Sequence, residues 1–552
     1  MDTCSDVSPC QNGASCIDIQ ISPGYLCQCL TGYYGYNCST LNQCLLPANP
    51  CQNGASCSNS LNNYTCSCLP GYSGRNCSVY DACSLTPCGD NGVCTDTLIS
   101  PNYYSCNCNF GWTGSQCNYS YPTTQQGLKL VGSGRVGSSR QGTSVAISKD
   151  GTTLVVGAPN DNSFVGSIWI FINNGTQFIQ YRNKFTGDAS PDGMGNTVAI
   201  SANGNTIVTG GLGGSPNNIN TAIWIFVKNS TNGWFKQGPT LRFGYNIPIC
   251  SIALSSLDGN TLAIGMCGDS GQGTTTILVR DQLTGNWTQQ GSKLIGTPSY
   301  SAAQQGQALS LSADGNTLAI GAPGDISPYD PNLSPDDGSV WIFVRDPLSG
   351  NWTQEEKLDA IGIDYNINVP EFGSSVSLSG DGNIVAIGAP QGNWITDSQG
   401  QTFIFTRNST GLWNQFKSFL FGTGCIATFD GCLEGSHVSL NSDGNILAIG
   451  GDVLFSGTIG AVWIFIFNGT DWVQAESKLS PMNYTGASVS MSTGLSLSDN
   501  GILAAGGPYD NSQIGATWIF VGPTMDTCED LSPCSNTTTC INTQISPSYV
   551  CQ

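Results

Sequence analysis

The sequence predicts an all-β protein in which a seven-bladed β-propeller is flanked by small disulfide-rich modules. A motif of the type Asp314-Gly315-Asn316-Thr317-Leu318-Ala319-Ile320-Gly321 recurs seven times, with turn glycines at positions 151, 204, 259, 315, 382, 444 and 501. Successive glycines are 53 to 67 residues apart, and a period of this size is typical of solenoids and propellers. The chain also holds 26 cysteines, 18 of them before residue 119 and four after residue 524.

Each repeat contains four predicted strands. The first, such as residues 310–312, runs into Asp-Gly or Asn-Gly, for which we predict a tight primed hairpin turn because this dipeptide accepts positive φ at both central positions. The second ends at Gly-Ala-Pro, since proline removes a backbone donor. The third carries Trp-Ile-Phe, as at 341–343, and the fourth follows a further turn, as at 352–358. Four short antiparallel strands repeated seven times, without a helical period, are typical of a propeller.

The third-strand tryptophans are expected to pack between the blades, because aromatic side chains dominate protein cores. They are Trp169, Trp224, Trp341, Trp463 and Trp518. A sugar-stacking role for some of them is the alternative.

The two ends of the propeller sequence complement each other. The seventh repeat stops after Trp518–Val521 and lacks a fourth strand, whereas residues 125–130 copy the fourth strand at 289–294. We therefore predict that residues near 125–132 complete blade seven, so that the propeller spans residues 125–524. Closure of this kind leaves no open sheet edge.

One repeat resembles a known family. Phe372-Gly373 followed by Gly388-Ala389-Pro390 resembles the FG-GAP repeat of integrin α-subunit propellers, over about residues 125–524. The calcium-binding blades of that family carry an Asp-x-Asp-x-Asp-Gly loop, which no repeat has here. The nearest acidic loop holds Asp325, Asp330, Asp336 and Asp337. We favour a solvated acidic loop, with calcium as the alternative, since hard cations need six to eight suitably placed oxygens.

Residues 1–118 hold three sextets of cysteines. Each ends in Cys-x-Cys, then eight residues and a last Cys, with Gly-Tyr or Gly-Trp inside this segment. Spacing alone allows fifteen pairings per sextet, and zinc is disfavoured because six cysteines occur without a histidine. The pattern resembles EGF-like modules, which we place at 1–38, 39–77 and 78–118. Modules this small rely on disulfides instead of a large core.

The EGF resemblance implies that the first cysteine bonds to the third, the second to the fourth and the fifth to the sixth. The implied pairs are Cys4–Cys16, Cys10–Cys27, Cys29–Cys38, Cys44–Cys57, Cys51–Cys66, Cys68–Cys77, Cys83–Cys94, Cys88–Cys106 and Cys108–Cys117. Within the propeller we predict Cys250–Cys267, placed symmetrically about the turn of blade three, and Cys425–Cys432 between blades five and six.

Module two resembles calcium-binding EGF modules in part. Asn42 precedes Cys44 and Asn59 follows, but the first acidic ligand of that pattern would fall on Thr40. Calcium is therefore an alternative, and no cofactor is required. Residues Ser15, Ser56 and Thr539 precede the third cysteine of their modules, where EGF modules of some organisms carry O-fucose.

Asn-x-Ser/Thr sequons occur in register. Six lie in the turn between the third and fourth strands of blades one to six, at Asn174, Asn229, Asn286, Asn351, Asn408 and Asn468. Others are Asn37, Asn63, Asn76, Asn118, Asn332, Asn483 and Asn536. The register predicts one face and rim coated with glycan. The opposite face, with loops such as 323–339 and 390–401, is the expected contact surface.

The C-terminal segment restarts the first module. Residues 525–552 repeat residues 1–28 at an offset of 524, so Met1 need not be an initiator. This partial module implies the pairs Cys528–Cys540 and Cys534–Cys551. We expect that the chain continues or that a neighbouring subunit completes the module.

Charge and composition narrow the function. A net charge of −20 disfavours nucleic acid and anionic membranes, no apolar run approaches the length of a membrane span, and the cysteines indicate an extracellular location. The chain has one histidine, His437, and no spacing specifies a catalytic set. We therefore expect no enzyme, with a carboxylate-only glycosidase as the catalytic alternative.

We expect a structural module of an extracellular glycosylated fibre or surface appendage that self-associates into a linear or helical assembly. The modular plan is similar to that of EGF-bearing glycoproteins of algal mastigonemes. The alternative is an adhesion or receptor ectodomain that binds a protein or glycan ligand on the propeller face.

Overall fold

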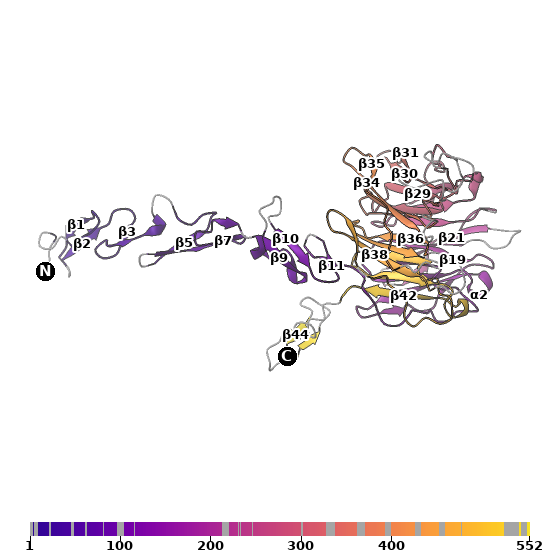
Figure 1. Cartoon of the computed structure of the whole chain (residues 1–552), viewed down its shortest axis with the longest axis horizontal. Coiled ribbons are helices and arrows are strands. Elements are labelled where there is room, and N and C mark those ends of the chain that lie inside the picture. The colour runs from indigo at the N-terminus through magenta and orange to yellow at the C-terminus, as the bar shows by residue number, and fades with distance from the viewer. Residues whose placement is uncertain are drawn as a thin grey trace. The chain divides into compact units, whose positions relative to one another are not determined.

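The computed structural model (Figure 1) divides the chain into a first unit, residues 1–118, and a second unit, residues 119–552. The residues that it describes are 4, 9–20, 24–45, 49–60, 63–80, 82–96, 104–114, 116–211, 220–229, 231, 233–245, 247–299, 302–326, 337–361, 370–391, 399–424, 432–451, 459–475, 477–523, 540–542 and 549–551.

The first unit consists of small hairpins held by cystines. Its strands are β1 (Ser15–Asp18), β2 (Tyr25–Gln28), β3 (Tyr33–Tyr34), β4 (Thr40–Leu41), β5 (Ser56–Ser60), β6 (Asn63–Ser67), β7 (Tyr72–Ser73), β8 (Val79–Tyr80), β9 (Gly92–Asp96), β10 (Tyr104–Cys108) and β11 (Trp112–Thr113). Short 3₁₀ turns η1 (Gln43–Leu45), η2 (Ala82–Leu85) and η3 (Gly89–Asn91) connect them. Cys38, Cys77 and Cys117 are fully buried, so the cystines themselves supply the interior of each module.

Seven antiparallel sheets of the second unit form the blades of a propeller. Blade one contains β14 (Ser144–Ile147), β15 (Thr153–Ala158), β16 (Ser167–Asn173) and β17 (Phe178–Gln180), with β18 (Phe185–Thr186) also on β16. Blade two contains β19 (Met194–Ile200), β20 (Thr206–Gly211), β21 (Asn220–Lys228) and β22 (Trp234–Lys236), with β23 (Leu241–Tyr245) also on β21. Blade three contains β24 (Ser251–Leu254), β25 (Thr261–Met266), β26 (Thr274–Arg280) and β27 (Trp287–Gln289).

The remaining blades repeat this order. Blade four contains β28 (Ala308–Leu311), β29 (Thr317–Ala322), β30 (Ser339–Arg345) and β31 (Trp352–Leu358). Blade five contains β32 (Ser375–Leu378), β33 (Ile384–Ala389), β34 (Gln401–Arg407) and β35 (Trp413–Gln415). Blade six contains β36 (Glu434–Leu440), β37 (Ile446–Gly451), β38 (Ala461–Phe467) and β39 (Trp472–Gln474). The predicted fold class, an all-β seven-bladed propeller with disulfide-rich modules, is confirmed.

Blade seven is built from both ends of the second unit. It contains β40 (Gly494–Leu497), β41 (Leu503–Gly507) and β42 (Ala516–Val521), with β13 (Thr124–Gln125) as its outer strand. Thr124 pairs with Val521 and Gln125 with Phe520, and Leu130 forms an antiparallel bridge to Thr517. The ring is thus closed by residues that precede blade one in the sequence.

Other elements are short. They are β12 (Tyr119–Ser120), the single turns α2 (Asp161–Phe164), η4 (Asp269–Gly271) and α3 (Asp510–Gln513), and the hairpin β43 (Cys540–Asn542) with β44 (Tyr549–Cys551). None of the helices in the described ranges combines the length and the apolar character that a membrane span requires.

The predicted two-residue primed turn is wrong. Ser312 pairs with Thr317 across a loop of four residues, and the Gly315 amide donates to Ser312 O at 2.9 Å. Only Gly315, with φ +70°, has the left-handed conformation, whereas Asp314 is absent from the positive-φ residues. Asp314 Oδ1 instead accepts the Asn316 amide at 3.0 Å and the Ser312 hydroxyl at 2.6 Å. These side-chain bonds favour a four-residue loop, which is most often built on an ordinary β-turn.

The recurring glycines mark where neighbouring blades touch. A Cβ on Gly321, in the second strand of blade four, would lie 2.1 Å from the carbonyl oxygen of Gly373, just before the first strand of blade five. The Phe-Gly and Gly-Ala-Pro motifs are therefore two sides of one backbone contact, which only residues without a side chain permit.

The tryptophans fill the space between blades. Trp169, Trp224, Trp341, Trp463 and Trp518 are at most 1% exposed. A sugar-stacking role is therefore wrong for these five residues. At the same strand position blade five has Phe403 and blade three has Thr276.

Candidate functional site

The six sequons in register are all solvent-exposed at the turns between third and fourth strands. In blade five the sequon asparagine itself begins the turn: Asn408 Oδ1 accepts the amide of Thr410 at 2.9 Å, its hydroxyl at 2.7 Å and the Leu412 amide at 3.0 Å. The same pattern joins Asn174 to Thr176, Asn229 to Thr231 and Asn468 to Thr470. Because Oδ1 is the atom used, the amide nitrogen that carries an N-glycan is left available.

Blades three and four have a longer version of this turn. Asp346 Oδ1 accepts the amides of Leu348 and Ser349 at 2.9 and 2.7 Å, and Asp281 does the same in blade three. The sequon residues Asn286 and Asn351 therefore lie at the start of the fourth strand and take no part in the Asx turn. The spacing of the sequons in the sequence did not distinguish those whose asparagine begins the turn from those whose asparagine follows it.

The other predicted sugar sites differ in exposure. Asn63, Asn118, Asn483, Ser15 and Ser56 are exposed, whereas Asn37 and Asn76 are half-buried. Asn76 Oδ1 accepts the Tyr64 hydroxyl. Asn332, Asn536 and Thr539 lie outside the described residues.

The structure brings the predicted cysteine partners of the three modules together. Disulfides join Cys4–Cys16, Cys10–Cys27, Cys29–Cys38, Cys44–Cys57, Cys51–Cys66, Cys68–Cys77, Cys83–Cys94, Cys88–Cys106 and Cys108–Cys117. Cys432 is disulfide-bonded, and its predicted partner Cys425 lies outside the described residues, as do Cys528 and Cys534 of the pairs predicted with Cys540 and Cys551. No cysteine in the described ranges is free.

The disulfide of blade three forms in a register that was not predicted. Blade three has one extra loop residue, since Ser255 rather than Ser256 pairs with Thr261. Cys250 is therefore not directly opposite Cys267. The bond nevertheless spans the ends of β24 and β25, with a Cα–Cα distance of 5.9 Å.

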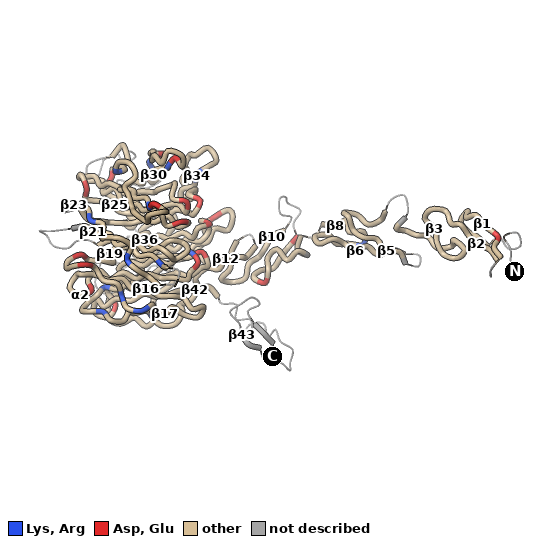
Figure 2. Tube along the Cα trace, turned by 180° about the vertical axis from the view of Figure 1, so that it is seen from behind, with Lys and Arg blue, Asp and Glu red and all other residues tan. Residues whose placement is uncertain are grey.

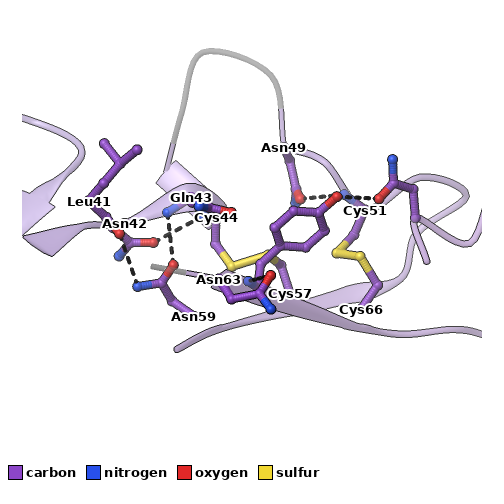
Figure 3. The surroundings of a disulfide bond; sticks show 12 residues. Leu41, Asn42, Gln43, Cys44, Asn49, Cys51, Cys57, Asn59, Asn63 and Cys66 are labelled. Carbon is purple, nitrogen blue, oxygen red and sulfur yellow. Dashed lines mark hydrogen bonds between the residues drawn. A yellow bond between two sulfur atoms is a disulfide. The ribbon is translucent and has the colours of Figure 1, made fainter. Parts of the chain in front are cut away.

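Figure 3 shows the calcium candidates of module two engaged with the backbone. Asn59 Oδ1 accepts the Gln43 amide at 2.8 Å, and Asn42 Oδ1 accepts the Cys44 amide at 3.1 Å. Asn59 Nδ2 donates to the Tyr34 hydroxyl at 3.0 Å. The side-chain amide thus connects module two to β3 of module one. Two amide oxygens that already accept N–H groups do not fit the oxygen cage that calcium requires.

The acidic loop of blade four also fails to fit a calcium cage. Asp325 is fully buried, with Lys357 Nζ at 2.7 Å and the Ser339 hydroxyl at 3.0 Å. Asp337 is 1% exposed, so the prediction of a solvated loop is wrong at these two positions. Asp330 and Asp336 lie outside the described residues. Among the residues that are described, no group of three acidic, histidine or cysteine side chains is placed to hold a metal.

The Asp325–Lys357 pair belongs to a repeated structural feature that the sequence analysis missed. A lysine on or just after the fourth strand pairs with a buried aspartate in four blades: Lys129–Asp510, Lys184–Asp161, Lys293–Asp269 and Lys357–Asp325. Three of these lysines also lie over the blade tryptophan, at 5.3 to 6.0 Å from the ring centre. The dipeptide Lys-Leu or Lys-Phe, which recurs in these repeats, was the available signal.

The inner strands of all seven blades line a central cavity of about 240 Å³. Lys149 reaches into it, with Nζ 3.4 Å from Leu440 O and 3.8 Å from Asp499 Oδ1. Burial lowers the pKa of Lys149, and the carboxylates of Asp499 and Asp443 oppose this effect. The cavity wall is tied from blade to blade: the hydroxyls of Ser310, Ser377, Ser439 and Ser496 accept the amides of Leu378, Leu440, Leu497 and Ile147.

The histidine lies in the wall of blade six. His437 is on β36, opposite Gly450, and burial lowers its pKa to about 4. Glu434, three residues earlier, is fully buried, and burial raises its pKa to about 8 although the Gly422 amide and Lys478 favour the charged form. Glu434 Oε2 accepts the Gly422 amide, while Oε1 has no hydrogen-bond partner among the described residues.

Comparison with known proteins identifies the modules. The sequence model of the EGF-like domain matches residues 4–37 and 44–76, and that of the Pvs28 EGF domain matches residues 82–156. The chain therefore contains EGF-like modules, which with their disulfides are typical of extracellular proteins. The comparison with curated protein sequences gave no match.

Two solved structures are similar to the chain at low identity. The periplasmic gluconolactonase PpgL of Pseudomonas aeruginosa is 13% identical, with a TM-score of 0.41, over 62% of this chain and 85% of its own. A Bacteroides uniformis protein provisionally assigned as a 6-phosphogluconolactonase is 14% identical, with a TM-score of 0.42, over 67% of this chain and 97% of its own.

Proposed function

We propose that this chain is a non-catalytic structural repeat of an extracellular glycosylated fibre or surface appendage, in which EGF-like stalks alternate with propeller discs. The repeat of residues 1–28 at residues 525–552 carries the proposal. The same module start stands on both sides of one propeller, which is the sequence pattern of an array.

The stalk and the disc each have a feature that supports this role. In the first unit, Asn59 of module two bonds to Tyr34 of module one, so neighbouring modules are joined by more than the linker. Charged residues are sparse in this unit, where Arg75 is the single basic residue (Figure 2). In the second unit, six exposed sequons around one face support a glycan coat, which would keep the discs soluble and set their spacing.

The proposal that the chain is not an enzyme is supported by the positions of the titratable side chains in the propeller. Glu434 and His437 have displaced pKa values and lie on β36 of blade six, where Glu434 is fully buried. Lys149, whose pKa is also lowered, reaches the central cavity and is paired there with Asp499. Perturbed groups mark catalytic sites when they face a cleft, whereas burial between strands is the ordinary position of packing residues.

Cryo-electron microscopy of the native material tests the proposal. We expect filaments whose axial repeat contains one set of EGF-like modules and one propeller, with glycan density at the turns that hold Asn174, Asn286 and Asn408. Discrete monomers that bind a soluble protein or glycan would contradict the fibre and favour an adhesion or receptor ectodomain.

A further inference from the structure

We propose a further function for the propeller: it is a force-sensitive joint, in which tension along the chain peels the closing segment of blade seven from β42. The first observation behind this proposal is that the two ends of the propeller sequence lie next to each other in blade seven. Thr124 is paired with Val521, and the Thr123 amide donates to Val521 O at 2.9 Å. The segments that precede Tyr119 and follow Pro523 are therefore attached at the same end of one strand pair.

The second basis is the order in which the bonds would break. β13 and β42 are antiparallel, so their hydrogen bonds succeed one another away from the attachment points. After the Thr123 bond come Gln126 N–H to Ile519 O, at 2.8 Å, and the reciprocal bonds of Leu130 and Thr517, at 2.7 and 3.0 Å. Tension at the near end loads one bond at a time. A strand pair pulled lengthwise would instead share the load among all its bonds.

The closing segment is also the weaker partner. β42 is held on its other edge by β41 over five paired residues, whereas β13 has only β42 beside it. Side chains also retain the segment. The Ser120 hydroxyl donates to Asn500 O at 2.9 Å, Gln125 Oε1 accepts the Met482 amide at 2.7 Å, and Gln126 Nε2 donates to Thr176 O at 2.9 Å. Tyr121 is buried, and Lys129 Nζ lies 2.6 Å from Asp510 Oδ2. Under tension, the closing segment therefore detaches from β42 before β42 detaches from β41.

Peeling has a defined stopping point. Gly132 is bound to Gln141 through both its amide and its carbonyl, at 2.6 and 3.1 Å, and Ser133 O accepts Trp169 Nε1 at 2.8 Å. These bonds anchor the chain in blade one. Residues 120–131 are thus released first, and 12 residues at about 3.5 Å each give roughly 40 Å of free chain. The exposed edge of β42 could then pair with another strand.

The biological meaning of this joint rests on the proposed function, because only a stalk under tension would load it. The mechanical behaviour itself is tested on the isolated full-length chain by single-molecule force spectroscopy through its two ends. We expect a low-force step of about 40 Å before the disc unfolds. The described disulfides of the modules close their loops, so these modules contribute no step of that size.

A crosslinked variant decides the cause of the step. Thr124→Cys with Val521→Cys joins two residues that face each other in an antiparallel pair, where Cα atoms are about 5.5 Å apart, within disulfide range. The step should vanish in this variant and persist in the matched Thr124→Ser/Val521→Ser chain. The joint is ruled out if the unmodified chain shows no such step, or if the step survives in a chain whose new disulfide is verified by mass spectrometry. Imaging of native material is independent of this result, so failure of the fibre and failure of the joint are distinguishable.

Discussion

Replacing Glu434 with glutamine is expected to stabilise the propeller in alkaline solution and to leave its stability unchanged in acid. Glu434 occupies the position that Gln141 and Gln305 occupy in blades one and four. Gln141 binds both the amide and the carbonyl of Gly132, and Gln305 binds both groups of Gly296. Glu434 accepts the Gly422 amide through Oε2. A proton on Oε1 would allow it to complete the same pair by donating to the Gly422 carbonyl.

The size of the effect follows from the pKa. Burial raises the pKa of Glu434 from its ordinary 4.5 to about 8, so the folded state retains a proton that the unfolded chain releases. The stability contributed by this carboxyl is complete below pH 4.5 and is lost as the pH rises toward 8. Each pKa unit corresponds to about 1.36 kcal/mol, so the loss approaches about 5 kcal/mol above pH 8. Lys478 opposes it, and His437 adds no charge because burial lowers its pKa to about 4.

Urea unfolding of the full chain between pH 5 and pH 9 measures this difference. The free energy of unfolding of Glu434→Gln should be close to that of the unmodified chain at pH 5, exceed it increasingly as the pH rises to 8, and keep a constant excess above pH 8. Gln141→Glu is the matched control, because it should introduce the same alkaline loss into blade one. The reasoning is refuted if the Glu434→Gln chain keeps the pH dependence of the unmodified chain.

Four further outcomes are expected. Cys250→Ala/Cys267→Ala should lower the free energy of unfolding by about 3 kcal/mol in a urea titration, because the bond closes a loop of 17 residues; an unchanged midpoint would contradict this. Trp341→Ala should cost about 3–5 kcal/mol and the half-buried Trp287→Ala clearly less, so equal losses would argue against inter-blade packing as the source. Asn286→Gln and Asn408→Gln should each remove one glycan by mass spectrometry, but only Asn408→Gln should also destabilise its turn, by about 1 kcal/mol, because only Asn408 holds turn amides. Chelation of calcium should leave the thermal unfolding of the chain unchanged, since the oxygens of Asn42 and Asn59 already accept amides; a lowered midpoint would show that calcium is bound elsewhere.

The sequence predicts the number and strand order of the blades better than it predicts the turn conformation and the buried polar contacts of individual blades. The Asp-Gly-Asn period and the Trp-Ile-Phe strands identify seven blades because they reflect backbone geometry shared by all of them. The turn type could not be read from the Asp-Gly dipeptide alone, since Ser312, two residues upstream, supplies the hydroxyl that shapes the loop. The role of Glu434 was also hidden. Its position becomes recognisable only when repeats are aligned on strand register, which places it with Gln141 and Phe372.

Residue differences between the blades are confined to single blades, and the proposed opening of the disc is likewise confined to blade seven. Blade three has Thr276 where five blades have tryptophan, and it also carries the Cys250–Cys267 bond, while blade six combines Glu434 with His437. Each blade contacts its two neighbours. A residue that departs from the repeat at one interface between blades is therefore compensated by other residues of the same interface. Blade seven differs in kind, because its outer strand is joined to the remainder of the sheet only by non-covalent bonds. Loss of that strand leaves the six other sheets and β40–β42 intact. The opening that we propose should therefore reverse on relaxation, and a chain that extends by about 40 Å yet fails to reclose would show that the other interfaces depend on the closing strand.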